Sequence, residues 1–332
     1  MTKQRSHAYF LAWAIFILIV GVVLPLGARQ YQLALLTEMI IFALFAVSYN
    51  LLLGYAGLLS FGHAMFFGLG AYTVAIVFNR IPGLSFFGAV IISVMVTTAA
   101  GFAVGSLLLR HKGVPFALLT LAFNALFYAI ATKWHSITGG DDGLSIRLPN
   151  INLGFAHLKT TDITVFYYIT LIIIGLMTLF CWYFTRTAMG QTVLLMRENE
   201  ERMKFLGYNT NVSRLILFVF TGFLAGLAGS FYTLFNQFTS ITAISIDMST
   251  IVVLMVIIGG TGSFIGPILG ACVYIYLQDF LSDITDRWPF IMGLIFVFMI
   301  LYVPRGLSGL INSLIERLRG RWHLPGNIET EE

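Results

Sequence analysis

The chain contains few charged residues. Only 10% of its 332 residues are Asp, Glu, Lys or Arg, whereas a soluble domain usually carries about 25%. In addition, 58% of the residues are hydrophobic, so a water-soluble protein of this composition could not cover its surface with polar groups. The composition therefore excludes an ordinary soluble domain and indicates a membrane protein.

Cysteine is also scarce. The chain has two cysteines, Cys181 and Cys272, and both lie in apolar stretches. Their spacing fits neither a disulfide framework nor a metal site. We therefore expect both thiols to be small buried groups, which is the usual role of a free cysteine.

Sequence motifs of catalysis are missing as well. There is no G-x-x-x-x-G-K-[ST] phosphate loop, so the chain should not bind ATP as a P-loop ATPase does. There is no H-E-x-x-H motif and no Cys/His cluster, so we expect no metal or other cofactor on this chain. A membrane-embedded enzyme would need clustered acids, histidines or metal ligands near the membrane surface, and we predict no catalytic residues.

Long apolar runs dominate the rest of the sequence. Runs of about 20 apolar residues match the hydrocarbon thickness of a bilayer, and a helix satisfies its own backbone hydrogen bonds there. The sequence thus predicts an all-α fold, a polytopic transmembrane helical bundle of about ten spans. The predicted spans are 9–27, 31–53, 57–79, 84–109, 114–134, 163–185, 213–237, 248–258, 264–282 and 287–303. The first predicted span resembles a signal peptide, but its apolar run is longer than the apolar region of a signal peptide. We therefore interpret it as a retained span.

A glycine cluster separates the eighth and ninth predicted spans. Gly259 and Gly260 are followed by Gly266-Pro267, and several such residues together should break a helix. If the N-terminus is cytoplasmic and all ten spans cross, most of the 19 basic residues fall on the cytoplasmic side, as expected. This distribution of basic residues is obtained only if the chain breaks at the glycine cluster. It predicts that both termini lie in the cytoplasm. The net charge of +4 is then a topology signal, and no nucleic-acid partner is expected.

We expect a single transmembrane domain over residues 1–332, with two longer loops. The external loop is 135–162 and the internal loop is 186–212. Within the internal loop, the stretch 190–207 is rich in helix-forming residues and has apolar residues on both sides of a polar middle. Such an amphipathic helix could lie on the lipid surface, could be a solvated connector, or could dock into a groove of a cytoplasmic partner.

The stretch 50–72 holds five glycines and one histidine. Small residues let helices pack closely in lipid, whereas transporter sites often use a broken or unwound helix. His63 favours the broken helix, because an ionisable side chain at membrane depth should face a cavity or a polar partner, although a packing role is also compatible. Hydrogen bonding between helices is the default role of buried asparagines. The candidate pathway residues are Asn50, Ser60, Gly62, His63, Asn124, Gly259 and Gly260.

The external loop contains Thr138-Gly139-Gly140-Asp141-Asp142-Gly143-Leu144. Glycine and aspartate at this density predict a tight turn. Asp141 and Asp142 could in principle bind calcium, but they lack the spacing of a calcium-binding loop. The sequence therefore favours the turn.

Four of these stretches together resemble one known family. Residues 50–64, which read N-L-L-L-G-Y-A-G-L-L-S-F-G-H-A, resemble the signature of the branched-chain amino acid ABC transporter permeases. The stretch 138–144 is similar to the external T-G-G-x-x-G-L of that family, 190–207 to its cytoplasmic coupling loop, and 259–267 to its late glycine motif. The resemblance covers most of the chain in the same order, and it implies the fold of an ABC importer permease.

The resemblance also implies partners and roles. Such permeases pair with a second homologous permease chain, two cytoplasmic ABC ATPase subunits and a periplasmic or external solute-binding protein, in the lipid bilayer of the bacterial inner membrane. The coupling loop would insert into the ATPase, which implies a role for Arg197, Glu198, Asn199, Glu200, Glu201, Leu206 and Gly207. The external turn would place Gly140, Asp141 and Asp142 at the docking site of the binding protein. Many ABC importers carry E-A-A early in this loop, but this chain has Glu200-Glu201-Arg202, so docking is assigned to the loop as a whole.

The substrate is left open by the sequence. The resemblance implies branched-chain or other hydrophobic amino acids, while urea, short amides and aromatic acids use similar permeases. An ion-coupled secondary transporter is the alternative mechanism, but its usual mark is a set of ionisable residues at the membrane midplane, and only His63 is a plausible deep candidate.

Overall fold

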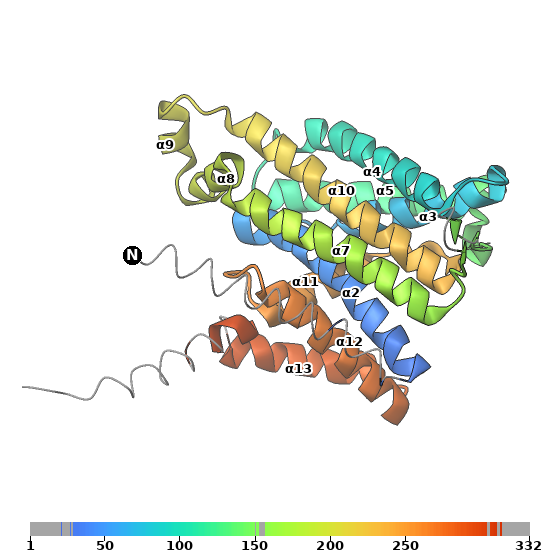
Figure 1. Ribbon diagram of the computed structural model, residues 1–332. Coiled ribbons are helices and arrows are strands. Elements are labelled where there is room, and N and C mark those ends of the chain that lie inside the picture. The colour runs from blue at the N-terminus through green and yellow to red at the C-terminus, as the bar shows by residue number, and fades with distance from the viewer. Residues whose placement is uncertain are drawn as a thin grey trace, which may run out of the picture.

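The computed structural model describes residues 29–149, 151–152, 157–303 and 306–310, together with residues 21, 27 and 313. It is a bundle of long helices with a few short strands (Figure 1). The helices are α2 (Gln30–Asn50), α3 (Ala64–Arg80), α4 (Phe86–Leu108), α5 (Val114–Lys133), α6 (His135–Thr138), α7 (Ile163–Arg186), α8 (Ala188–Glu198), α9 (Glu200–Phe205), α10 (Thr210–Asn236), α11 (Ile246–Gly259), α12 (Gly266–Ile284) and α13 (Trp288–Tyr302). Shorter elements are the π-helix Leu51–Tyr55, the 3-10 helices Gly140–Asp142 and Ile241–Ile244, and the strands β1 (Leu144–Ser145), β2 (Ile151–Asn152), β3 (His157–Leu158) and β4 (Phe238–Thr239).

Two helices form the centre of the bundle. The helix α10 packs against α3 and α4, and α2 packs against α7, α10, α11 and α12 (Figure 1). From Ile41 onward, every residue of α2 is buried. A helix that is apolar on all sides belongs in the interior of a membrane bundle, and here its neighbours cover it. The core is therefore arranged around α2 and α10.

Glycines set the close approach of α3 and α10. An added Cβ at Gly229 would overlap the carbonyl oxygen of Phe67, and one at Gly70 would overlap the carbonyl oxygen of Gly226. Between lipid-embedded helices there is little hydrophobic driving force, so close backbone packing through small residues stabilises the contact. The Ser93 hydroxyl joins this crossing from α4, because it donates to the Gly70 carbonyl at 2.9 Å.

The structure supports a multi-span helical protein but does not confirm ten spans. Five described helices are long and apolar enough to cross a bilayer: 30–55, 86–108, 114–133, 163–186 and 210–236. Three more are apolar but shorter, namely α3 with 17 residues, α11 with 14 and α13 with 15. The predicted first span, 9–27, lies almost entirely outside the described residues.

A helix break is present in each of the two glycine-rich stretches. The third predicted span, 57–79, is helical only from Ala64, because residues 56–63 leave the helix after the π-helix 51–55. The predicted break at the glycine cluster is confirmed, since α11 ends at Gly259 and α12 begins at Gly266. Gly260 ends α11 with a φ of +97°, a conformation that favours glycine, and α11 and α12 then pack against each other.

The connecting segments gather at two opposite ends of the bundle (Figure 1). At one end, β1 pairs with β4, and Arg80 Nη2 donates to the Ser136 carbonyl at 2.8 Å. At the other end, α8 and α9 lie beside the connection between α4 and α5, where Lys112 contacts Glu200. We call these the β1–β4 end and the α8–α9 end. The predicted external and internal loops therefore lie at opposite ends.

Candidate functional site: the α8–α9 segment and the broken helices

The amphipathic stretch 190–207 forms two short helices instead of one. Thr187 caps α8, because its side chain accepts a hydrogen bond from Gly190 N at 3.4 Å. Asn199 ends α8 and caps α9, since its side-chain oxygen accepts from Arg202 N at 2.9 Å. Asparagine is among the best N-cap residues, so the chain turns at this point. Helices α8 and α9 together form the α8–α9 segment.

An ionic cluster centred on Glu200 fixes the α8–α9 segment to the bundle. The Glu200 carboxylate pairs with Lys112 from the α4–α5 connection, with Arg214 from α10, and with Lys204 at 3.2 Å. Thr210 Oγ1 donates to the same carboxylate at 3.2 Å. The side chain of Arg214 is 8% exposed and that of Glu200 is 17% exposed, so water screens their attraction less than at an open surface.

The cluster controls the ionisation of Glu200. Partial burial would by itself raise the pKa of this carboxyl, but hydrogen bonds from Arg214 and Lys112 and the charge of Arg214 lower the pKa from its usual 4.5 to about 2. A carboxyl whose pKa is lower in the folded state stabilises the fold at any pH above its unfolded value. This contribution is lost as the pH falls from about 4.5 through about 2.

The Glu200→Gln substitution should therefore destabilise the protein at neutral pH. It removes the charge that pairs with the nearly buried Arg214, and an uncompensated buried charge is costly. We expect the apparent Tm of the detergent-solubilised protein to fall by about 4 °C or more at pH 7. The neighbouring Glu201→Gln variant is the control, because Glu201 is exposed, and its Tm should stay within about 1 °C of the parent. The parent–variant difference should shrink between pH 4.5 and pH 2, and a difference independent of pH would contradict this assignment.

The α8–α9 segment exposes apolar side chains just after the ionic cluster. Phe205 is 90% exposed, Leu206 65% and Tyr208 50%. Gly207, with a φ of +84°, makes the turn that presents them. We call Phe205, Leu206 and Tyr208 the apolar tip. Exposed apolar residues that a firmly held segment presents together are typical of an interaction surface.

The other predicted coupling residues have different environments. Glu198 and Glu201 are exposed, whereas Asn199 caps α9 and Glu200 holds the ionic cluster. Arg197 reaches back to the bundle, where its guanidinium Nη1 donates to the carbonyl of Gly54.

The predicted pathway residues lie together at the two helix breaks. His63 is completely buried and stacks on Phe45 with a centroid distance of 5.7 Å. Its Nε2 lies 2.9 Å from Ser48 Oγ, which already donates its only proton to the Phe45 carbonyl at 2.7 Å. With the Ser48 proton assigned to the Phe45 carbonyl, His63 Nε2 carries a proton and donates it to Ser48. His63 Nδ1 is then a bare acceptor without a partner in the described part of the chain.

Two buried asparagines bridge the same region. Asn50 Nδ2 donates to the Ser263 carbonyl at 3.2 Å, and Asn124 Nδ2 donates to the Ile244 carbonyl at 2.9 Å. In both cases, the amide oxygen has no hydrogen-bond partner among the described residues. Each asparagine thus ties a long helix to an irregular segment, which extends their expected interhelical role.

The remaining predicted pathway residues lie where segments of backbone pack closely together. Ser60 is buried, and its Oγ accepts from Gly62 N at 3.4 Å. An added Cβ at Gly62 would overlap the Thr120 carbonyl of α5, and one at Gly259 would overlap the Gly266 carbonyl. Gly260 lies in the turn after Gly259. All seven predicted pathway residues are buried in this structure.

Comparison with known proteins decides the family. The profile of the family described as branched-chain amino acid transport system / permease component matches residues 31–303. This chain belongs to that permease family. Because its described helices include several that can span a bilayer, it is a multi-pass membrane protein.

Curated relatives carry transport names throughout. The chain is 26% identical over 312 residues to the high-affinity branched-chain amino acid transport system permease protein LivM of Salmonella typhimurium, covering 88% of this chain and 73% of the relative. It is 26% identical to the probable branched-chain amino acid transport permease protein LivM of Methanocaldococcus jannaschii, over 76% of this chain and 81% of the relative. It is 25% identical to the autoinducer 2 import system permease protein LsrC of Shigella flexneri, over 78% of this chain and 75% of the relative. No solved structure matches the chain. The permease is thus a Liv-type transport subunit of the ABC class.

The turn at residues 138–144, which the sequence predicts to be external, is tightly built. Gly139, Gly140 and Gly143 all have positive φ, and an added Cβ at Gly140 would overlap the ring of His135. The side chains of Asp141 and Asp142 are exposed at the β1–β4 end. The predicted tight turn is therefore present.

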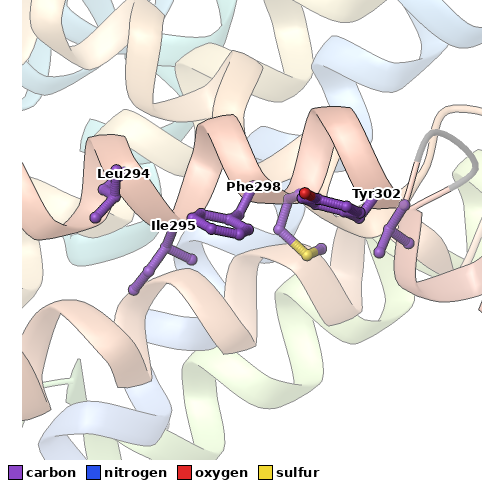
Figure 2. A pocket seen from close by; sticks show the side chains of 6 residues that line it. Leu294, Ile295, Phe298 and Tyr302 are labelled. Carbon is purple, nitrogen blue, oxygen red and sulfur yellow. The ribbon is translucent and has the colours of Figure 1, made fainter.

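One shallow hollow lies on the surface of the permease. It has a volume of about 500 Å³ and is lined by Leu294, Ile295, Phe298, Met299, Tyr302 and Val303, all from or next to α13 (Figure 2). None of the predicted pathway residues lines it. Its apolar lining suits the lipid-facing surface of a membrane helix.

Sequence reasoning missed several residues of this site. Lys112 and Arg214 do not stand out among the basic residues of the sequence, yet both bind Glu200. Ser48 and Thr120 are partners of the 56–63 segment, and neither stood out within its apolar helix. A polar residue inside an apolar run was the only signal available, and the sequence does not pair such residues across helices.

Proposed function

We propose that the permease is the membrane-spanning subunit of an ATP-driven importer for branched-chain or other hydrophobic amino acids. The names of the LivM relatives support this substrate class. One observation carries the proposed mechanism: the α8–α9 segment is fixed to the bundle through Glu200 while it exposes the apolar tip. A segment that is both anchored and uncovered suits the transmission of force from a docked ATPase.

The proposed assembly follows from this segment. Two cytoplasmic ATPase subunits bind at the α8–α9 end of this chain and of a second homologous permease chain. A periplasmic or external binding protein delivers substrate at the β1–β4 end, where the Gly140–Asp142 turn contributes to its docking. The permease then lies in the bacterial inner membrane with its α8–α9 end and both termini in the cytoplasm. Residues 186–212 serve as the coupling loop of a single transmembrane domain.

Reconstitution in proteoliposomes tests this function. With ATP, the ATPase partners and the binding protein, leucine uptake should exceed the ATP-free control by at least about tenfold, because hydrolysis drives import against the gradient. Uptake by the permease alone under an ion gradient, without ATP, would instead support a secondary transporter. The relatives from autoinducer 2 import systems give a reason to test other substrates, and competition with urea, short amides and aromatic acids covers the remaining classes.

The translocation pathway is proposed to run between the two helix breaks. Its candidate residues are Asn50, Ser60, Gly62, His63, Asn124, Gly259 and Gly260. Their complete burial corresponds to a closed state, and transport requires the 56–63 segment and the α11–α12 turn to separate. Acceptors that lack a partner in the described chain, such as His63 Nδ1, would meet polar groups of the substrate when the pathway opens.

The His63→Ala variant tests the pathway proposal. We expect uptake per amount of monodisperse protein to fall by about tenfold, a normalisation that accounts for the cavity left by truncating a buried, stacked side chain. Thr170→Ala is the matched control, because Thr170 is equally buried but bonds only to the Phe166 carbonyl of its own helix. Unchanged uptake by His63→Ala would leave this histidine with a packing role only.

A further inference from the structure

The last turn of α8 contacts the π-helix that follows α2. The Arg197 guanidinium donates to the carbonyl oxygen of Gly54, which lies in the π-helix Leu51–Tyr55. Its aliphatic part covers Gly57, where an added Cβ would lie 3.1 Å from Arg197 Cγ. The last carbonyls of a helix have no partner within that helix. Arg197 therefore supplies a partner that the end of this π-helix cannot provide for itself.

The opposite side of Gly54 faces the turn between α11 and α12. An added Cβ at Gly54 would lie 2.7 Å from the carbonyl oxygen of Thr261 and would overlap Asn50 Oδ1. Asn50 also donates to the Ser263 carbonyl in that turn at 3.2 Å. The backbone at Gly54 thus lies between α8 and the 260–265 turn, with no room for a side chain.

Three irregular parts of the chain meet at this point, which we call the Gly54 junction. They are the end of α8, the π-helix with the non-helical segment 56–63, and the turn 260–265. A π-helix within an α-helix is uncommon and is frequent at functional sites. Packed junctions of this kind carry coupling when they have discrete alternative arrangements. A displacement of α8 would reach both helix breaks through Gly54.

We infer that Arg197 is a positioning residue that transmits displacement of the α8–α9 segment to both helix breaks. This inference rests on the proposed function, because docked ATPases supply the displacement. Arginine suits the position since its guanidinium stays charged and offers several donors in a fixed plane. A charged donor on a carbonyl makes a stronger bond than a neutral one, so the link can transmit pulling as well as pushing.

Distances within the permease test the junction without any transport assay. Spin labels at Leu195→Cys, on the exposed face of α8, and Gly262→Cys, where nothing lies within 4 Å, report the separation of α8 from the turn. The two native cysteines are first replaced by alanine. We expect a narrow distance distribution in this background and a broad one after Arg197→Gln. Arg202→Gln is the matched control, because Arg202 is exposed in the same segment, and it should keep the narrow distribution. Identical distributions for Arg197→Gln and the background would overturn the inference.

Transport measured with the ATPase partners and the binding protein adds the functional comparison. Uptake per bound ATPase should fall about tenfold in Arg197→Gln, and the uptake of Arg197→Lys should lie between those of Arg197→Gln and the parent. Unchanged uptake would refute the role of Arg197. Parallel loss of ATPase binding and uptake would also refute it, because Arg197 would then be a docking residue. If the parent itself shows no ATP-dependent uptake, the proposed function fails, whereas the spin-label distances still decide the junction.

Discussion

The Gly229→Leu variant should leave little folded permease in the membrane. An added Cβ at Gly229 overlaps the Phe67 carbonyl, so the backbones of α3 and α10 must separate. Backbone atoms cannot move aside as the end of a flexible side chain can, and overpacking of this kind costs about 3 kcal/mol or more. The crossing of α3 and α10 lies at the centre of the bundle, so its loss affects the whole fold.

Fluorescence-detected size exclusion of a tagged permease measures this effect. The yield of monodisperse Gly229→Leu protein should fall by about tenfold or more relative to the parent. Gly175→Leu on α7 is the matched control, because no atom lies within 4 Å of an added Cβ there. If the two variants gave equal yields, the close crossing of α3 and α10 would not be required for folding.

The Phe205→Asp substitution should strongly weaken binding of the ATPase partners to the permease. Phe205 is the most exposed residue of the apolar tip, and an interface centred on an aromatic anchor loses 2 kcal/mol or more when that anchor is removed. Aspartate adds the cost of burying a charge against an apolar surface. The free permease should be unaffected, because the exposed side chain of Phe205 supports little of the fold.

Co-purification and stability together test this prediction. The amount of ATPase that follows a tagged Phe205→Asp permease should fall at least about tenfold, with its Tm within about 1 °C of the parent. Ile81→Asp is the control, since Ile81 is an exposed apolar residue between α3 and α4, next to Arg80 at the β1–β4 end. Equal ATPase recovery for Phe205→Asp and the parent would show that the apolar tip is not the docking surface.

Most of the helical architecture was predictable because hydropathy and glycine act locally. The apolar runs predicted α4, α5 and α7 to within a few residues, and the glycine cluster predicted the turn after Gly259. The prediction of the third span, 57–79, was only partly right. Residues 57–63 have a composition that suits a span, but they form irregular backbone that packs closely on α5, where an added Cβ at Gly62 would overlap the Thr120 carbonyl.

The sequence could not predict which side chains pair across the fold. Lys112 and Glu200 are 88 residues apart, and Arg197 and Gly54 are 143 apart. Each pair forms only because helix packing brings the two segments to the same end of the bundle. The family resemblance placed Arg197 and Glu200 in the proposed coupling loop, but it could not separate the residue that anchors the segment from the one that contacts the helix break.

The identity of the associated proteins tests the account most directly. The full-length permease would be tagged, extracted gently from its native membrane, and the proteins that accompany it identified. The permease of an ABC importer should bring with it a second homologous permease chain together with ABC ATPase subunits. A solitary permease that transports substrate in proteoliposomes under an ion gradient, without ATP, would contradict it.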